Sequence, residues 1–408
     1  MKEINVLQIN TVDFGGGAEQ VAVDLNNLLP NSVLLVNYRF SNLPSVIEFP
    51  KSFFDKLLNI LSVIGRKTKL IKQDVKRDFF MGENFNFTYS KLKKIKEYQA
   101  AQIIHLHNIH GGYFDLNDLR KIAKEKIIVW TLHDMWAITG GESYIMDDEN
   151  FKIGIGVTPY VDLPPLNNPY IDRRNHFIQK KHEILNSIND RIHFVCPSFW
   201  LENSLKESYV AKNMKHVSVI HNGVNTQYFF NKKERGWSKP RVLIFNFLKN
   251  SQLKGTYLFW SIYPEIKDLC DLAVVGDKPG DDVTCFSHYN KISGRKDLND
   301  LYNSVDILVF PSMADNFPLT TLEAMIAGVF LISSDTGGII EQIQTEYGAL
   351  FVRGNSEDLL EKIQEALLNF SETRKKGEKA STEIDKNFNL NGAVKKYQEL
   401  YEKIIGRE

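Results

Sequence analysis

The sequence predicts an α/β protein in which two domains follow one another, each built on a parallel sheet. Short apolar runs rich in β-branched residues alternate with amphipathic stretches, a pattern typical of strand–helix units on such a sheet. The series occurs twice, and no helical or strand period crosses residues 222 to 238 between the two series. The 408 residues are also enough for two or three domains of ordinary size.

The first series predicts an N-terminal domain over residues 1–222. Its strand-like runs are INVLQI at 4 to 9, VLLV at 33 to 36, QIIHLH at 102 to 107, IIVWTL at 127 to 132, HFVC at 193 to 196 and VSVI at 217 to 220. The second series predicts a C-terminal domain over 238–390, with the runs RVLIFNF at 241 to 247, LAVV at 272 to 275, VDILVF at 305 to 310 and VFLIS at 329 to 333.

The last residues, 391–408, predict a helix that packs back on the N-terminal domain. Its apolar stripe, at steps of three and four residues, consists of Val394, Tyr397, Leu400, Tyr401, Ile404 and Ile405.

Composition excludes several classes of protein. The 50 basic and 50 acidic residues cancel, so the overall basic field of a nucleic-acid binder is missing. The 3 cysteines have no paired spacing, which argues against a disulfide framework or a four-cysteine zinc site and favours the cytoplasm. The sequence shows no signal peptide and no apolar stretch near the roughly 20 residues of a membrane span.

Residues 51–80 combine apolar and basic side chains in an amphipathic stretch. Such a stretch either presents a basic face to solvent or lies on an anionic membrane surface. The sequence favours the solvated face and leaves peripheral membrane contact as the alternative.

Three glycines, Gly15, Gly16 and Gly17, stand in the first strand-to-helix turn. Glycine lets backbone N–H groups approach an anion, and a helix N-terminus adds partial positive charge. The spacing fits neither the dinucleotide fingerprint nor the P-loop. A phosphate cradle and a plain tight turn are therefore equally consistent with this segment.

His133, Asp134 and Trp136 follow the apolar run at 127 to 132. Ligands of open α/β sheets bind beyond the carboxyl ends of strands, and a histidine there can exchange a proton near neutral pH. The alternative is a structural histidine. The nearby His105, His107 and His110 have a spacing that could suit a metal, but no partner ligand is evident and ordinary packing is favoured.

In the second half, Lys254 follows a strand and is placed to pair with phosphate oxygens. Asp315 and Glu323 bracket a loop and the start of a helix, so both could accept hydrogen bonds from sugar hydroxyls. Backbone amides near Thr320 and Thr321 would point at an anion. The alternative is local, because Thr320-x-x-Glu323 is also a capping-box pattern.

Taken in order, these segments resemble the retaining GT-B glycosyltransferases of glycosyltransferase family 4. The similarity runs through nearly the whole chain and lies in the glycine loop, TLHDMW with TGG, CPSFWLENS, HNGVN, LKG, the Asp315 to Glu323 segment and SSDTGG. It implies two Rossmann-like domains with a cleft between them. The TLHDMW and TGG pieces look most like bacterial enzymes that build capsule, exopolysaccharide or lipopolysaccharide.

The resemblance implies roles for single positions. Lys254 would bind the donor diphosphate, Asp315 the sugar hydroxyls and Glu323 the ribose, with His133 beside the donor sugar. The other positions expected to line the donor site are Gly16, Gly17, Lys249, Arg295, Asn316, Phe317, Leu319, Thr320 and Thr321. Asp134 and Trp136 would face the acceptor.

The implied reaction moves a sugar from a UDP- or GDP-sugar to a hydroxyl of a saccharide or lipid-linked saccharide, with retention and without a metal or other cofactor. Three positions depart from the family pattern. Asp315 replaces the usual glutamate. The arginine that commonly precedes the phosphate-binding lysine is absent, and Lys249 is the basic residue nearby. Glu142 follows TGG where relatives often continue into a cysteine cluster. Two alternatives stay open: a catalytically silent nucleotide-sugar-binding scaffold subunit, and a nucleotide-sugar epimerase.

Overall fold

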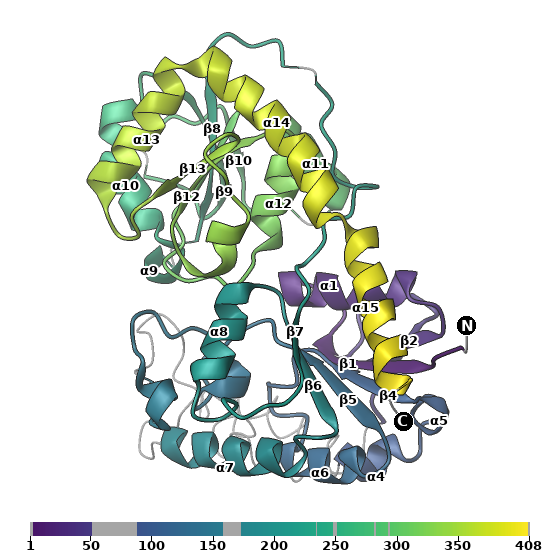
Figure 1. Ribbon diagram of the computed structural model, residues 1–408. Coiled ribbons are helices and arrows are strands. Elements are labelled where there is room, and N and C mark those ends of the chain that lie inside the picture. Colours follow the sequence, from purple (N-terminus) through teal and green to yellow (C-terminus); the bar gives the residue numbers. More distant parts are fainter. Residues whose placement is uncertain are drawn as a thin grey trace, which may run out of the picture. The chain divides into compact units, whose positions relative to one another are not determined.

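The computed structural model describes residues 3–50, 88–157, 173–233, 235–247, 251–280, 283–292 and 294–406. Contacts divide the chain into unit 1, Met1–Ile220 with Val394–Glu408, and unit 2, His221–Ala393 (Figure 1). The amphipathic stretch 51–80 and Lys249 lie outside the described residues.

Unit 1 contains a parallel sheet of seven strands in the order β3-β2-β1-β4-β5-β6-β7. The strands are β1 Val6–Val12, β2 Ser32–Tyr38, β3 Val46–Glu48, β4 Ile103–Leu106, β5 Ile127–Thr131, β6 Ile192–Cys196 and β7 Val217–Val219. The helices are α1 Gly17–Leu28, α4 Thr88–Leu92, α5 Lys96–Ala100, α6 Leu119–Ala123, α7 Arg174–Ser187 and α8 Phe199–Glu207. The strand order reverses between β1 and β4, so the loops after these two strands flank the switch point where such sheets bind ligands.

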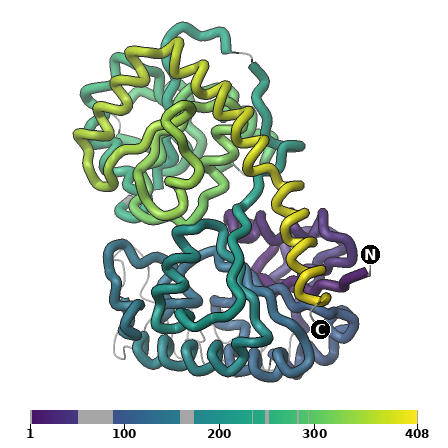
Figure 2. Tube along the Cα trace, viewed as in Figure 1, coloured from purple at the N-terminus to yellow at the C-terminus, as the bar shows by residue number. Residues whose placement is uncertain are grey.

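Alternating side chains fix the two faces of this sheet. Ile104 and Leu106 of β4 belong to the core that also contains residues of α6 and α7. The intervening His105 faces the other way, where it meets Tyr401 of α15, Leu390–Ile405. Tyr397 of the same helix hydrogen-bonds Thr131 at 2.9 Å. The last turns of the chain therefore pack on the sheet of unit 1, where they contact β4 and β5 (Figure 2).

Unit 2 contains a second parallel sheet, in the order β10-β9-β8-β11-β12-β13. The strands are β8 Arg241–Asn246, β9 Asp271–Gly276, β10 Ser287–Tyr289, β11 Ile307–Phe310, β12 Phe330–Ser334 and β13 Gly348–Phe351. The helices are α9 Ser251–Lys254, α10 Thr256–Ile266, α11 Arg295–Asn303, α12 Leu319–Ile326, α13 Ser356–Leu368 and α14 Phe370–Phe388. Here the order reverses between β8 and β11. Two sheets of this kind confirm the predicted pair of Rossmann-like α/β domains.

Three short edge strands escaped the sequence prediction: β3, β10 and β13. Each has three or four residues, and β3 and β10 contain polar side chains. They are too short for a strand period to stand out from their neighbours. Their pairing is decided by the sheet edge that they join.

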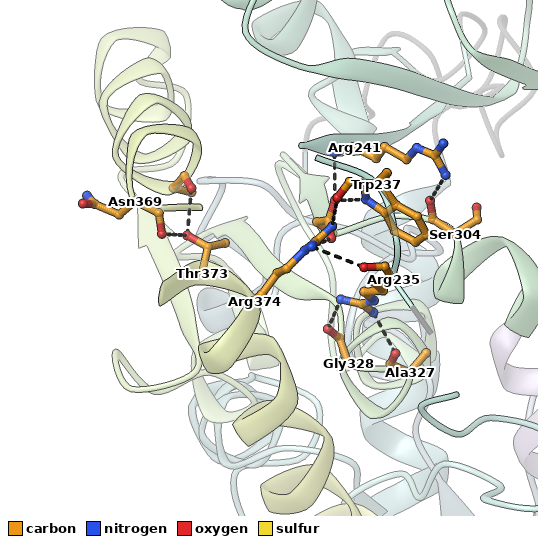
Figure 3. Close-up of polar contacts among 11 residues, drawn as sticks. Arg235, Trp237, Arg241, Ser304, Ala327, Gly328, Asn369, Thr373 and Arg374 are labelled. Carbon is orange, nitrogen blue, oxygen red and sulfur yellow. Dashed lines mark hydrogen bonds and ion pairs between the residues drawn. The ribbon is translucent and has the colours of Figure 1, made fainter. Parts of the chain in front are cut away.

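The stretch 222 to 238 was predicted as a linker. In the structure its described residues are part of unit 2 and contact other elements of that unit. The Arg235 guanidinium donates to the carbonyl oxygens of Ala327 and Gly328 at the end of α12 (Figure 3). Trp237 Nε1 donates to the buried carboxylate of Asp306 at 2.6 Å. The sequence pattern could not predict this attachment, because the segment has no regular secondary structure and is fixed by side-chain contacts to residues far along the chain.

The Asp306 carboxylate is the centre of this attachment. It also accepts from the Arg241 amide at 2.9 Å and from Arg374 Nε at 2.9 Å, and Arg374 in turn donates to the Trp237 carbonyl. The side chain of Asp306 is fully buried. Such a carboxylate is stable only while its donors are present.

We predict that Asp306→Asn lowers the free energy of unfolding of unit 2 by about 3 kcal/mol, because the Arg374 charge then loses its buried partner. Urea unfolding followed by circular dichroism measures this change. The matched control is Asp300→Asn, which removes the exposed ion pair with Lys232 and should change stability by less than about 0.5 kcal/mol. Equal effects of the two substitutions would contradict the attachment role.

Among the described residues, no helix is long and apolar enough to cross a membrane.

Candidate functional site

Lys254 and Asp315 meet at the switch point of unit 2. Lys254 ends α9 in the segment after β8, and Asp315 lies in the loop after β11. The Lys254 Nζ to Asp315 Oδ2 distance is 3.1 Å, and both side chains are partly exposed. Two residues far apart in sequence are therefore brought together where a ligand of this sheet would bind.

Gly255 explains how Lys254 reaches this position. The residue has a φ of 63°, in the left-handed region that glycine adopts without strain. A Cβ on Gly255 would also overlap the carbonyl oxygen of Pro311. The adjacent Leu253 carbonyl accepts from the Met313 amide at 2.8 Å. Close contact between these two backbones thus fixes the lysine beside the loop after β11.

The N-terminus of α12 faces the same loop. Its N-cap is Pro318, and no side chain caps the helix there. The Thr321 hydroxyl instead donates to the Pro318 carbonyl at 2.8 Å. The backbone amides of the first turn, at Leu319 and Thr320, thus provide the kind of uncapped helix end that binds anions.

Glu323 is the fifth residue of α12, so the capping-box alternative is wrong. Its side chain is buried and lies near the hydroxyl of Tyr302 in α11. Burial, reinforced by the Glu323 carboxylate, raises the pKa of Tyr302 well above its usual range. Tyr302 therefore stays neutral beside the carboxylate.

Phe317 is held by the segment that begins unit 2. The Phe317 carbonyl accepts from Asn222 Nδ2 at 3.0 Å, and its ring stacks on His221 with centroids 5.0 Å apart. His221 Nε2 lies 3.0 Å from Glu341 Oε2. The motif HNGVN thus positions the loop that precedes α12, a role that sequence reasoning did not assign.

In unit 1, the partly exposed His133 begins a chain of hydrogen bonds that leads into the buried interior. Its Nε2 lies 2.9 Å from His107 Nδ1, His107 Nε2 lies 2.7 Å from Gln8 Oε1, and Gln8 donates to the Ser32 hydroxyl at 2.8 Å. Because the Gln8 oxygen accepts from His107 Nε2, the His107 Nδ1 atom accepts from His133. Burial lowers the pKa of His133 to about 4, so the ring is neutral near pH 7.

His105 in β4 and His107, which directly follows β4, are both buried and hydrogen-bonded. His105 Nε2 lies 2.8 Å from the Thr131 hydroxyl, and its Nδ1 lies 2.7 Å from the Tyr401 hydroxyl. In the described part of the chain, no group of three His, Cys, Asp or Glu side chains could hold a metal. For His105 and His107, these contacts agree with the packing interpretation.

Asp134 pairs with His110 beyond the carboxyl ends of β5 and β4. Asp134 Oδ2 lies 3.2 Å from His110 Nε2, and Asp134 Oδ1 accepts from the Trp136 amide at 2.8 Å. Burial disfavours a charge on His110, but contact with Asp134 and the nearby Glu19 outweighs it and raises the pKa of the ring. The pair therefore combines a carboxylate with a histidine that is readily protonated.

Lys181 of α7 supports the loop that carries Asp134 and Trp136. Its ammonium group donates to the carbonyl oxygens of Trp136 and Thr139 and lies 3.9 Å from the centroid of the Trp136 ring. The residue is buried, and burial lowers its pKa to about 7. The charges of Glu142 and Asp134 favour the protonated form but do not outweigh burial.

Comparison with known families covers both units. A family model described as Glycosyltransferase Family 4 matches residues 71–228, and one described as Glycosyl transferases group 1 matches residues 239–369. The chain belongs to the family 4 glycosyltransferases. This membership confirms the resemblance seen in the sequence motifs.

Relatives and solved structures agree with this assignment. A putative colanic acid biosynthesis glycosyl transferase of Escherichia coli is 24% identical over 396 residues, which cover 88% of this chain and 90% of that protein. The N,N'-diacetylbacillosaminyl-diphospho-undecaprenol alpha-1,3-N-acetylgalactosaminyltransferase of Campylobacter jejuni is 29% identical over 205 residues, 45% of this chain and 53% of that protein. The Anabaena protein HepE, solved in complex with UDP-glucose, has the same fold, with a TM-score of 0.61, 14% identity and coverage of 98% of this chain and 100% of that one.

The predicted site residues of this glycosyltransferase fall into two groups. Lys254, Asp315, Glu323 and the α12 N-terminus gather in unit 2, whereas His133, Asp134 and Trp136 gather in unit 1. Arg295 begins α11, with its guanidinium 4.8 Å from the centroid of the Tyr228 ring. The roles of all these residues, and those of Gly16, Gly17 and Lys249, stay predictions.

Sequence reasoning missed Glu19 and Lys181 and set His110 aside. The signals were faint: Glu19 stands two residues after the last glycine of the loop, and His110 follows the buried strand run. Lys181 stands in a helix whose sequence gives no hint of the loop that it supports. Only the tertiary contacts show what these side chains do.

We predict that the stability of unit 1 rises with pH between 7 and 9 because of Lys181. The unfolded chain keeps this lysine protonated over that range, whereas the folded chain, with a pKa of about 7, releases the proton. Stability therefore increases by about 2 kcal/mol, and this increase should be absent in Lys181→Met. Urea unfolding of both proteins at the two pH values measures the difference. Parallel pH dependence in both proteins would contradict the assignment.

Proposed function

We propose that this glycosyltransferase transfers a sugar from a UDP-sugar to a hydroxyl of a saccharide carried on a lipid diphosphate, with retention and without a metal ion, in bacterial polysaccharide synthesis. The observation that carries the proposal is the meeting of Lys254 with Asp315 beside the uncapped N-terminus of α12. A cation and open amides at one switch point are suited to a diphosphate.

In this proposal the donor diphosphate lies between Lys254 and the first turn of α12. The Asp315 carboxylate holds the lysine in the ligand-free protein. When the donor binds, the diphosphate oxygens take over the ammonium group and Asp315 turns to the hydroxyls of the sugar. As the glycosidic bond breaks, charge builds on the diphosphate, and fixed positive groups stabilise it without reorganising.

Glu323 is proposed to hold the nucleotide ribose. An ionised carboxylate accepts hydrogen bonds from a pair of hydroxyls, and burial beside Tyr302 limits competition from water. Asn316, Phe317, Leu319 and Thr321 would shape the surrounding site, and Arg295 would lie near the base.

Retention is proposed to arise by departure and attack on one face of the sugar. The bond from the anomeric carbon to the diphosphate breaks, a bond to the acceptor oxygen forms, and the leaving diphosphate takes the proton of that hydroxyl. A double displacement uses two carboxyl groups about 5 Å apart. Asp315 is instead paired with Lys254, which supports the one-face mechanism.

The donor and acceptor classes rest on similar proteins. HepE was solved with UDP-glucose, which supports a uridine nucleotide over the GDP alternative. The relatives named for colanic acid synthesis and for a diphospho-undecaprenol acceptor support a lipid-linked saccharide. Such an acceptor would place the reaction at the inner surface of the cytoplasmic membrane.

We predict that Lys254→Met lowers turnover of the UDP-sugar donor at least 100-fold, the usual effect of removing one group that stabilises transition-state charge. A panel of UDP- and GDP-sugars, screened by thermal stabilisation and nucleotide release, first identifies the donor. The matched control is Lys267→Met, which changes an exposed lysine of unit 2. Wild-type turnover in a folded Lys254→Met protein would exclude the diphosphate role. Donor binding by the wild type without any turnover on a panel of lipid-linked acceptors would favour a silent binding subunit.

A further inference from the structure

Residues 333–342, which we call the supporting segment, begin at the end of β12 and contain most of the motif SSDTGG. β12 pairs with β11 in parallel, with Ser333 beside Phe310. The supporting segment therefore leaves the sheet next to the loop 310–318, which carries Asp315 and leads into α12. Both segments lie at the carboxyl edge where the donor is proposed to bind.

Hydroxyl groups of the supporting segment donate to backbone carbonyl oxygens of this loop. The donor and acceptor residues are Ser333 and Phe310 at 2.8 Å, Ser334 and Ser312, and Thr336 and Met313 at 3.2 Å. Ser333 and Ser334 are completely buried, where an unpaired polar group is costly. The course of the loop is thus fixed by the supporting segment.

The glycine pair of the motif holds the backbone of Asp315. Gly337 has a φ of 55°, and a Cβ there would lie 1.7 Å from the Asp315 carbonyl oxygen. The Gly338 amide donates to the same oxygen at 3.3 Å. Only glycine fits at position 337, because both the left-handed φ and the close contact disfavour a side chain. Gly337 therefore sets the place from which the Asp315 side chain extends to Lys254.

Gln342 holds the first peptide unit of α12. Its buried Nε2 donates to the Pro318 carbonyl at 3.0 Å, and its Oε1 contacts the Thr321 hydroxyl. The Pro318 carbonyl and the Leu319 N–H belong to one planar trans peptide unit, so they point in opposite directions. Because the carbonyl points to the buried Gln342, the Leu319 amide points away from the interior. This amide is one of those proposed to bind the diphosphate.

A second peptide unit connects the supporting segment to the lysine. The Ser312 carbonyl accepts from Ser334, whereas the Met313 amide of the same unit donates to the Leu253 carbonyl at 2.8 Å. Leu253 directly precedes Lys254. The lysine, Asp315 and the amides of α12 are therefore all held by hydrogen bonds that lead back to the supporting segment.

We propose that the supporting segment is the positioning element of the donor site, in which Gly337 sets Asp315 for the sugar hydroxyls and Gln342 sets the α12 amides for the diphosphate. Both are positioning residues, because each acts through another group. The inference rests on the proposed function, since it explains how the same site is held in the geometry that transition-state stabilisation requires. It assigns the two residues to different parts of the donor, so their substitution should have separable effects.

The variant Gln342→Leu tests the diphosphate half of the inference. Isothermal titration calorimetry measures the dissociation constant of UDP directly and that of uridine by competition with UDP. We expect UDP affinity to fall at least about fivefold and uridine affinity to stay within about twofold, because uridine lacks the diphosphate that the amides bind. The matched control is Gln344→Leu, which changes an exposed glutamine two residues further along.

Two results with Gln342→Leu would overturn the inference. One is an unchanged UDP affinity. The other is an equal loss of affinity for UDP and uridine, which would indicate general damage to unit 2. Failure of the wild type to bind UDP more tightly than uridine would instead contradict the proposed function.

The variant Gly337→Ala tests the sugar half. We expect kcat with the UDP-sugar donor to fall at least about tenfold and the UDP dissociation constant to stay within about threefold, because UDP has no sugar for Asp315 to hold. The matched control is Gly354→Ala. Gly354 also has a left-handed φ, 81°, but a Cβ there would meet only the end of the Met313 side chain, at 3.6 Å.

The control variant introduces the same kind of backbone strain without the contact to Asp315, so it should keep kcat within about threefold of the wild type. Equal losses of kcat in the two glycine variants would overturn the role of Gly337. Thermal unfolding followed by circular dichroism checks that each variant is folded. If Gly337→Ala does not fold, the ratio of UDP to uridine affinity in Gln342→Leu decides the inference.

Discussion

The contact between Lys254 and Asp315 depends on one constraint of a parallel sheet, which is that every strand ends at the same edge. Where the strand order reverses, the loops after two neighbouring strands turn in opposite directions and leave room between them. In unit 2 these loops follow β8 and β11, and they carry the lysine and the aspartate. The left-handed Gly255 and its close approach to Pro311 then fix the distance between the two side chains.

The same constraint operates in unit 1, but the residues there give it the opposite electrostatic character. The switch point between β1 and β4 carries Glu19 and His110, with Asp134 in the loop after the next strand, β5. The two switch points therefore differ in the charged side chains that they carry.

The sequence predicted the strands best where they are buried on both faces and therefore read as continuous apolar runs. It also placed Lys254 and Asp315 at strand ends, which is why their meeting could be anticipated. It failed where local pattern and tertiary contact disagree. Thr320 and Glu323 have capping-box spacing, but the helix begins at Leu319, and so Glu323 falls in the helix body.

Other parts of the site had no signal that a single sequence can carry. Lys181 contacts a loop more than forty residues away, and the partners of Glu19 lie on two other loops. Arg235 is fixed by the end of α12 and Trp237 by Asp306. The sequence alone could not distinguish this attached segment from a flexible linker. Each of these contacts depends on a fold that brings distant residues together.

The most direct test of this account is a crystal structure of the protein with its UDP-sugar donor. The account predicts diphosphate oxygens within hydrogen-bonding distance of Lys254 Nζ and of the backbone amides at the start of α12. A diphosphate bound away from Lys254, with Lys254 still paired with Asp315, would contradict it.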